Sequence, residues 1–155
     1  MKKVIFCNPE KCNGCQICEV VCSSVKEHEI NPLLSRIRLV RIDPLVQMAL
    51  PCQLCDKTPC VASCPEKAIR VSQSGVIEID NDKCIFCGWC LHSCPFGAIM
   101  MNSRTRWIKI CDLCEGEPKC VEHCPKEALL FATREEVTQR IRKGSIGRLM
   151  DTLSQ

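Results

Sequence analysis

The sequence predicts an α+β fold of two modules built from short β-hairpins and short helices, followed by a C-terminal helical tail. Three observations predict it. Cysteine is very abundant, with 17 in 155 residues, and most of it falls into four groups of similar spacing. Segments with alternating apolar residues, which are typical of strands, lie between the groups. The last stretch has no cysteine, and its apolar residues follow helical spacing.

The four cysteine groups define the modules. In chain order the groups are Cys12, Cys15, Cys18 and Cys22; Cys52, Cys55, Cys60 and Cys64; Cys84, Cys87, Cys90 and Cys94; and Cys111, Cys114, Cys120 and Cys124. Proline follows the last cysteine of three groups, whereas Ser23 follows Cys22. Cys7 belongs to no group. Repeats of this kind indicate duplication of a small unit.

The segments between the groups predict three hairpins. Residues 69–80 alternate around Ser74 and Gly75, as strands joined by a tight turn do. Residues 36–50 read as two strands joined at Asp43 and Pro44, and residues 100–110 as a third hairpin. After each Cys-Pro pair (CPEKAIRV, CPFGAIMM, CPKEALLF) we expect a brief helix start and then a strand.

The tail predicts a helix. Thr133 can cap it, with Glu136 completing a capping box. We expect Gly144 and Ser145 to interrupt it, after which one apolar stripe follows i, i+3, i+4, i+7 spacing: Ile146, Leu149, Met150 and Leu153. The stripe can pack on the chain's own sheet or dock a partner, and both readings stay open.

The apolar runs, aromatic content and charge of the chain limit the kinds of function that it can have. No apolar run is long enough for a secretory signal or a membrane span, so we expect a cytoplasmic chain whose reduced, clustered thiols bind metal. Aromatic content is 4%, so metal sites should supply much of the folding energy. The formal charge of +3 counts cysteines as neutral. Sixteen thiolates around four cluster cores would change it to about −5, so nucleic-acid binding is not expected.

The cysteine spacing favours iron–sulfur clusters. Bacterial ferredoxins use C-x2-C-x2-C-x3-C-P, and the fourth cysteine binds the other cluster of a pair. The third group matches throughout, the first lacks only the proline, and the second and fourth lengthen one gap. Zinc is the rival, but zinc ribbons use two separated cysteine pairs. Clusters held by four cysteines have no open position for substrate, so we expect electron transfer and no catalysis by the chain itself.

Residues 2–132 resemble the four-cluster iron–sulfur subunits of the dimethyl sulfoxide reductase type. Within that group they are similar to the small subunits that serve carbon monoxide dehydrogenase, hydrogenases and tungsten enzymes of the aldehyde oxidoreductase family. Three stretches carry the resemblance: CQLCDKTPCVASCP, CIFCGWCLHSCPFGAI and CDLCEGEPKCVEHCP. It implies a duplicated bacterial ferredoxin fold in residues 1–132, with one module from 1–30 and 105–132 and another from 45–104. The tail, 133–155, is not covered.

The resemblance also implies crosswise ligation, first group with fourth and second with third. The implied ligand sets are Cys12, Cys15, Cys18 and Cys124; Cys22, Cys111, Cys114 and Cys120; Cys52, Cys55, Cys60 and Cys94; and Cys64, Cys84, Cys87 and Cys90. Four 4Fe–4S clusters would then form a wire in a bent row.

The expected role is electron transfer between a catalytic oxidoreductase subunit and a second redox protein. A tungsten enzyme of the aldehyde oxidoreductase type is the first choice of partner, then a nickel enzyme of carbon monoxide or hydrogen, then a molybdenum reductase. A free soluble polyferredoxin is the alternative within this class. A zinc-binding interaction module and a redox sensor are alternatives from other classes.

Several residues receive modest roles. Cys7 is expected to be a buried structural thiol. His28, His92 and His123 are expected at the surface, and Trp89 is expected to pack over a cluster. Ser23 offers an N–H and a hydroxyl where proline would offer neither. One hypothesis is that these groups raise the potential of the cluster at Cys22; the other is that Ser23 merely starts a turn.

Overall fold

The computed structural model describes residues 2–42, 46–102 and 106–153. Antiparallel strand pairs and short helices share the chain, which confirms the predicted α+β class. The elements are β1 (Lys3–Cys7), α1 (Ile17–Glu27), η1 (Pro32–Leu34), β2 (Arg38–Ile42), β3 (Val46–Leu50), α2 (Pro59–Ala62), β4 (Ile69–Val71), β5 (Ile77–Ile79), α3 (Trp89–Ser93), β6 (Ile99–Asn102), β7 (Trp107–Ile110), η2 (Leu113–Gly116), α4 (Lys119–Glu122), β8 (Leu129–Thr133) and α5 (Arg134–Leu153).

The three predicted hairpins are confirmed. Each is a two-stranded antiparallel sheet: β2 with β3, β4 with β5 and β6 with β7. The β4–β5 turn closes with a hydrogen bond from the N–H of Ser72 to the carbonyl of Val76, and Gly75 supplies the positive φ of 81° that this turn requires. The predicted joint at Asp43 and Pro44 lies outside the described residues.

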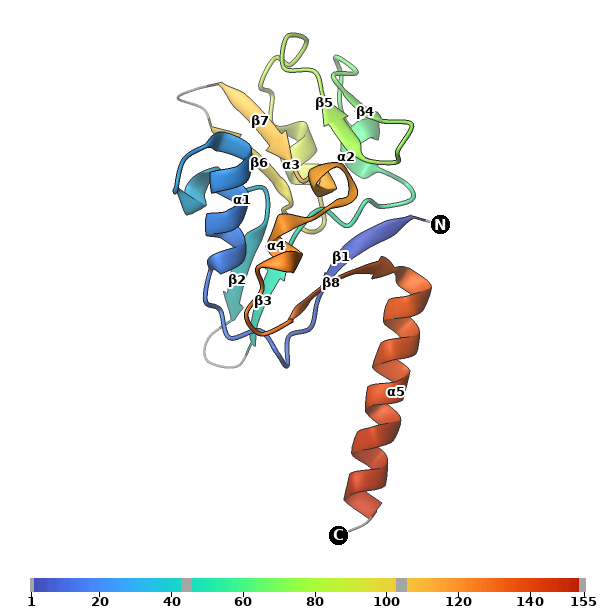
Figure 1. Cartoon of the computed structure of the whole chain (residues 1–155). Coiled ribbons are helices and arrows are strands. Elements are labelled where there is room, and N and C mark those ends of the chain that lie inside the picture. The colour runs from blue at the N-terminus through green and yellow to red at the C-terminus, as the bar shows by residue number, and fades with distance from the viewer. Residues whose placement is uncertain (1, 43–45, 103–105, 154–155) are drawn as a thin grey trace.

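A fourth sheet joins segments from opposite ends of the sequence. Strand β1 pairs antiparallel with β8, from Lys3 opposite Thr133 to Cys7 opposite Leu129. Figure 1 shows the two strands side by side, with α1 and α4 on the same side of the molecule. This pairing brings the first cysteine group next to the fourth, while α2 and α3 lie at the end of the molecule opposite α5.

The short helices precede the Cys-Pro pairs, so the prediction of a helix after each pair is wrong. Helices α2, α3 and α4 each begin one residue before the third cysteine of their group and end before the fourth. Proline disfavours helical backbone in the residue before it. Cys94, which precedes Pro95, is accordingly extended, with φ −79° and ψ 112°. After each proline a turn passes through a residue with positive φ, Lys67, Gly97 or Glu127, and enters a strand. Helix α1 was not predicted.

The core is small and partly made of cysteine. Ile5, Ile37, Leu54 and Ile108 are almost completely buried, and the cysteines pack against the same cluster of side chains. The hairpins meet around these side chains. The division into the two sequence-predicted modules remains a prediction. In the described part of the chain, no helix is long and apolar enough to cross a membrane.

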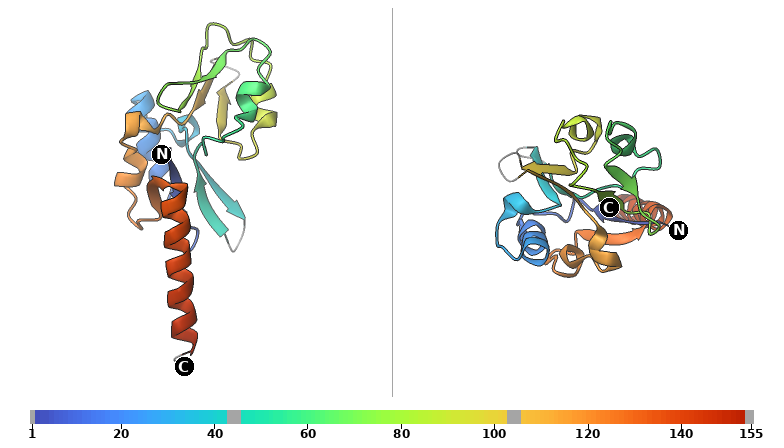
Figure 2. Two further views of the ribbon diagram at one scale, coloured as in Figure 1. Left: turned by 90° about the vertical axis from the view of Figure 1, so that its right-hand side faces the viewer. Right: turned by 90° about the horizontal axis from the view of Figure 1, so that it is seen from above.

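Helix α5 extends away from the rest of the molecule. Figure 1 and Figure 2 show it as a straight arm that extends from the end of β8. The predicted capping box is confirmed, because Glu136 Oε2 accepts from the N–H of Thr133 and Thr133 Oγ1 accepts from the N–H of Glu136. Val137 is buried at its base, whereas Ile141 and Ile146 are 51% and 62% exposed.

The predicted interruption at Gly144 and Ser145 is wrong, because α5 runs without a break to Leu153. Glycine costs a helix only about 1 kcal/mol relative to alanine, and the hydroxyl of Ser145 donates back to the carbonyl of Ile141. The side chains of three stripe residues lie outside the described part: Leu149, Met150 and Leu153.

Candidate metal centres

Cysteines of the first and fourth groups meet around one cavity. The lining of this cavity includes all four cysteines of what we call the Cys18 set: Cys12, Cys15, Cys18 and Cys124. Gly14, between the first two, has φ of 68°, and its carbonyl accepts from Arg41 Nη2 at 3.0 Å. The side chain of Gln47 lies where a Cβ on Gly14 would be. The β2–β3 hairpin therefore packs directly on this cysteine loop.

A second cavity lies between the same two groups, but here the first group supplies one cysteine and the fourth group supplies three. Its lining includes what we call the Cys22 set: Cys22, Cys111, Cys114 and Cys120. Cys22 comes from α1, and the other three surround η2 and α4. Asp112 Oδ1 accepts from the N–H of Cys114 at 3.0 Å, which fixes the start of this loop.

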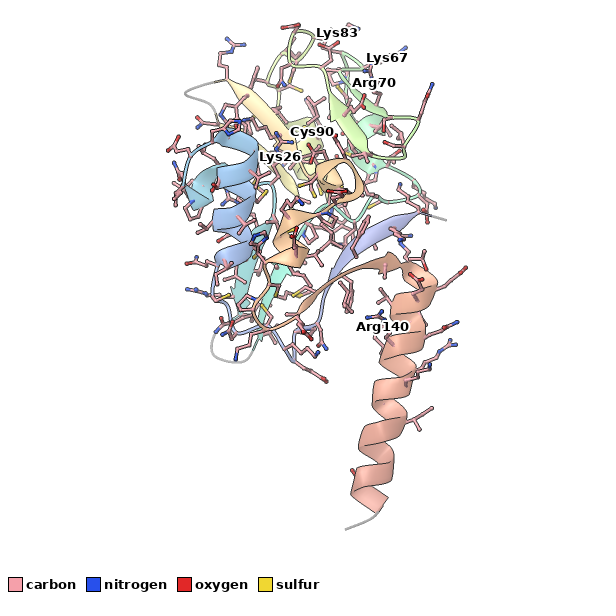
Figure 3. The ribbon with its side chains drawn as sticks, viewed as in Figure 1. Lys26, Lys67, Arg70, Lys83, Cys90 and Arg140 are labelled. Atoms are coloured by element: carbon pink, nitrogen blue, oxygen red, sulfur yellow. The ribbon has the colours of Figure 1, made fainter. Side chains whose placement is uncertain are left out.

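A third cavity joins the second and third groups. Its lining includes what we call the Cys90 set: Cys64, Cys84, Cys87 and Cys90. Cys87 is exposed, while Cys90 is buried. Figure 3 shows Cys90 in the interior of the upper part of the molecule, near α3.

The remaining four cysteines also lie close to one another. We call them the Cys60 set: Cys52, Cys55, Cys60 and Cys94. Burial, opposed by a hydrogen bond from the N–H of Leu54, raises the pKa of Cys52 to about 11, and the nearby Cys60, Cys94 and Cys55 add to the rise. Twelve of the sixteen sequence-predicted cysteines thus line three cavities, four in each, and the binding of a cluster by each of the four sets remains a prediction.

The four sets follow one another through the molecule. Burial is the main cause of the raised pKa of Cys120 and of Cys111. The nearby Cys18 raises the pKa of Cys120 further, and the nearby Cys52 does the same for Cys111. The Cys60 and Cys90 sets share helices α2 and α3, whose Ser63 and Ser93 hydroxyls hydrogen-bond at 2.9 Å. The order is thus the Cys18, Cys22, Cys60 and Cys90 sets. The two cysteines that are exposed, Cys15 and Cys87, belong to the two ends of this row.

Backbone N–H groups support the fourth cysteine of each group. In the three groups with proline, the alanine four residues later donates to the Sγ atom, at 3.2–3.4 Å; the pairs are Ala68 and Cys64, Ala98 and Cys94, and Ala128 and Cys124. Cys22 lacks this turn because α1 continues through it. The N–H of Arg36 donates to Cys22 Sγ at 3.3 Å instead.

The hypothesis that Ser23 starts a turn is wrong, and a raised potential of the cluster at Cys22 stays a prediction. Ser23 lies inside α1, fully buried, and does not start a turn. Its hydroxyl donates to the carbonyl of Val20 and accepts from the N–H of Asn31, so it is engaged away from the Cys22 sulfur. The absence of proline lets the helix continue, and a later segment supplies the N–H that the sulfur needs.

The donor chemistry fits iron–sulfur clusters. Burial, with smaller effects of neighbouring charges such as Glu19, raises the pKa of Cys18 to about 12, and burial raises that of Cys90 to about 11. Such thiols stay protonated near neutral pH, so four thiolates together require a positive core among them. Within the described residues, no three His, Cys, Asp or Glu side chains converge on a point that could hold one metal ion.

The other singled-out residues lie outside the sets. Cys7 is 3% exposed, and its Sγ accepts from the N–H of Ala49 at 3.3 Å. Burial raises the pKa of Cys7 to about 11, as expected of a structural thiol. The three histidines are at the surface, as predicted. Trp89 is 63% exposed, so most of its ring faces outward rather than packing over cysteines.

Five charged side chains beside the Cys22 set were not found from the sequence. Asp112 Oδ2 binds Arg36 Nη1 at 2.6 Å and Lys26 Nζ at 2.8 Å. Glu27 binds Arg36 Nη2 at 3.3 Å and also Lys109. We call these residues the ion network. They come from α1, the segment before β2, β7 and the fourth cysteine loop, so no spacing in the sequence relates them.

Comparison with known proteins decides the family. A family model described as a 4Fe-4S dicluster domain matches residues 45–134, which hold the second, third and fourth cysteine groups. The chain belongs to the 4Fe–4S dicluster family. It is therefore a ferredoxin-like iron–sulfur electron-transfer subunit and not an enzyme by itself.

Two relatives illustrate the breadth of this family. The chain is 40% identical over 121 residues to the "Aliphatic sulfonate oxidoreductase, polyferredoxin-like subunit" of Pyrococcus furiosus, covering 77% of this chain and 70% of that protein. It is 38% identical to the "Putative electron transport protein YsaA" of Escherichia coli, covering 88% of this chain and 94% of that protein.

A chain of one solved structure aligns with almost the whole of this chain. The active-site complex BamBC of benzoyl coenzyme A reductase with benzoyl-CoA contains a chain that is 28% identical, with a TM-score of 0.49. The match covers 99% of this chain and 97% of that one.

Proposed function

We propose that the chain carries four 4Fe–4S clusters, one in each cysteine set, and works as a wire between two redox proteins. The observation that carries this proposal is the row of four sets, each with cysteines from two groups, with Cys15 and Cys87 exposed at its ends. When bound, each cluster would accept and release one electron. The chain's own residues hold the thiolates in place, exclude water from the inner sets and donate N–H groups to the sulfurs.

We propose that the electrons come from, or go to, a catalytic oxidoreductase subunit in the cytoplasm, with a second electron carrier at the other end. The relative from Pyrococcus furiosus, named a subunit of an oxidoreductase, supports this role. A tungsten enzyme of the aldehyde oxidoreductase type is the first choice of partner, and then a nickel enzyme of carbon monoxide or hydrogen. Helix α5 would dock a partner, because beyond Val137 its described side chains are exposed up to Ile146.

Anaerobic purification through a tag on this chain, followed by elemental analysis, tests the proposal. We expect about sixteen iron atoms per copy, which is four for each of four clusters. Tungsten in a co-purified protein would support the first choice, and nickel or molybdenum would replace it with the other partners. A free polyferredoxin would show the iron without a partner. Zinc without iron would overturn the proposal.

A further inference from the structure

The Cys22 set differs from the other three in how its fourth cysteine is supported. The N–H donor to Cys22 comes from Arg36, fourteen residues away, and not from a Cys-Pro turn. The same residue lines the cavity of the Cys22 set, together with Asp112 and Lys119. Arg36 therefore contacts this set through its main chain, and its guanidinium binds Asp112, whose other carboxylate oxygen accepts from the N–H of Cys114.

The side chain of Arg36 is held firmly. Its two terminal nitrogens bind Asp112 at 2.6 Å and Glu27 at 3.3 Å, and only 18% of the side chain is exposed. Its buried Nε has no hydrogen-bond partner among the described residues. A guanidinium stays charged at every relevant pH. A fixed cation thus lies beside Asp112, the residue that follows Cys111 of the Cys22 set.

The ion network as a whole carries a positive excess. It contains three cations, Lys26, Arg36 and Lys109, against two carboxylates, Glu27 and Asp112. Its side chains are half-buried or nearly buried, at 14% to 35% exposure, so water screens their charges less than those on the surface. One-electron reduction of a cluster adds one negative charge, which nearby positive charge and N–H donors stabilise.

We propose that Arg36 sets the reduction potential at the Cys22 set. Its N–H replaces the donor that a Cys-Pro turn supplies elsewhere, and its guanidinium raises the potential of this second site in the row. This inference rests on the proposed function, since it needs a cluster in the Cys22 set. Arg36 would tune the reduction potential through the hydrogen bond that its N–H donates to Cys22 Sγ and through the electrostatic field of its guanidinium, without contact with any substrate.

Potentiometric titration of the full chain, followed by electron paramagnetic resonance, tests the inference. The step to follow is the one that changes in Cys22→Ser. Arg36→Gln keeps the N–H and loses the charge, and we expect it to lower that step. The ratio of reduced to oxidised cluster at fixed potential should fall about tenfold, which is about 59 mV for one electron. Arg36→Lys should restore most of the shift.

Two further variants complete the test. Asp112→Asn can still accept from Cys114 but loses a negative charge, so the same step should rise. Arg140→Gln makes the same charge change as Arg36→Gln at an exposed residue, and Figure 3 shows Arg140 on α5, away from the ion network. It should leave the profile unchanged.

The outcomes separate this inference from the proposed function. Wild-type protein without iron would overturn the proposed function. Iron-loaded Arg36→Gln with an unshifted or raised step would overturn only the role of Arg36. If Arg36→Gln loses its iron, Asp112→Asn decides, and a step that does not rise overturns the inference.

Discussion

The hydroxyl of Ser23 accepts a hydrogen bond from the backbone N–H of Asn31 at 3.2 Å. Ser23 lies in α1 and is 0% exposed, while Asn31 begins the short helix η1 that leads to Arg36. This bond folds the segment after α1 back over the helix. The segment then returns to Cys22, where the N–H of Arg36 meets the sulfur.

Replacing Ser23 should therefore weaken the protein from a position that holds no metal. Ser23→Ala removes one of the two acceptors of the N–H of Asn31, the other being the carbonyl of Glu29, and we expect a loss of about 0.5–1.5 kcal/mol in the free energy of unfolding. Anaerobic denaturant titration, followed by visible absorption and circular dichroism, measures it. Ser24→Ala is the matched control, because Ser24 is exposed. Equal stabilities of the two variants would contradict the role of Ser23.

Gly14 should resist substitution for two separable reasons. Its φ of 68° costs a side chain about 1–2 kcal/mol, and a Cβ would lie 1.5 Å from Gln47 Oε1. Gly97, with φ of 57° and open space around it, shares only the first reason. We expect Gly14→Ala to destabilise more than Gly97→Ala in thermal unfolding. Adding Gln47→Ala should remove the difference; if the difference persists, the contact with Gln47 is not its cause.

Cys7 and Cys87 should behave differently although both are cysteines. Cys87→Ala removes a proposed ligand, so iron should fall by about four of about sixteen atoms per chain. Cys7→Ala should keep all of the iron and lose about 1 kcal/mol of stability, the cost of a small void. Iron analysis after anaerobic gel filtration distinguishes them. Iron loss in Cys7→Ala would make Cys7 a ligand and contradict the assignment of the sets.

The capping box should govern the first turn of α5. Thr133→Ala removes the acceptor for the N–H of Glu136 and should cost about 1 kcal/mol locally, seen as faster hydrogen exchange near Val137. Thr138→Ala, whose hydroxyl bonds only within the helix, is the control. Similar exchange in both variants would argue against the cap.

The pH dependence of this cap has a defined sign. The hydrogen bond from the N–H of Thr133, opposed by slight desolvation, lowers the pKa of Glu136 below its ordinary 4.5. A lowered pKa stabilises the folded state above the ordinary value, and this contribution is lost as pH falls through the lower, folded value. Exchange protection at the start of α5 should thus be the same at about pH 6 and about pH 8. A fall in protection across that range would contradict this account.

Local patterns in the sequence were sufficient for much of the fold. Alternating residues around Ser74 and Gly75 define a hairpin wherever they occur, and the spacing of the cysteines limits the chemistry of their ligands. Helix α1 was missed because its positions also follow the ligand spacing between Cys15 and Cys22. Gly144 was given too much weight, since the penalty of one glycine is small beside the rest of a twenty-residue helix.

The ion network could not have been predicted in the same way. Lys26 and Glu27 meet Lys109 and Asp112 only after the chain has folded, and charged residues at such separations show no period. Likewise, nothing local to Ser23 shows that its hydroxyl will meet Asn31. The combinations of cysteines came from the resemblance and not from their spacing.

The pairing of β1 with β8 sets the order in which a growing chain can fold. Lys3 leaves the ribosome early, but its partner Thr133 is made 130 residues later. At ordinary synthesis rates that delay is roughly 10 seconds. The hairpins between them, and the cysteines from 52 to 94, can assemble first, while the first cysteines wait uncovered. A cell making this protein would therefore have to shelter Cys12 and Cys15 from oxidation until translation is nearly complete.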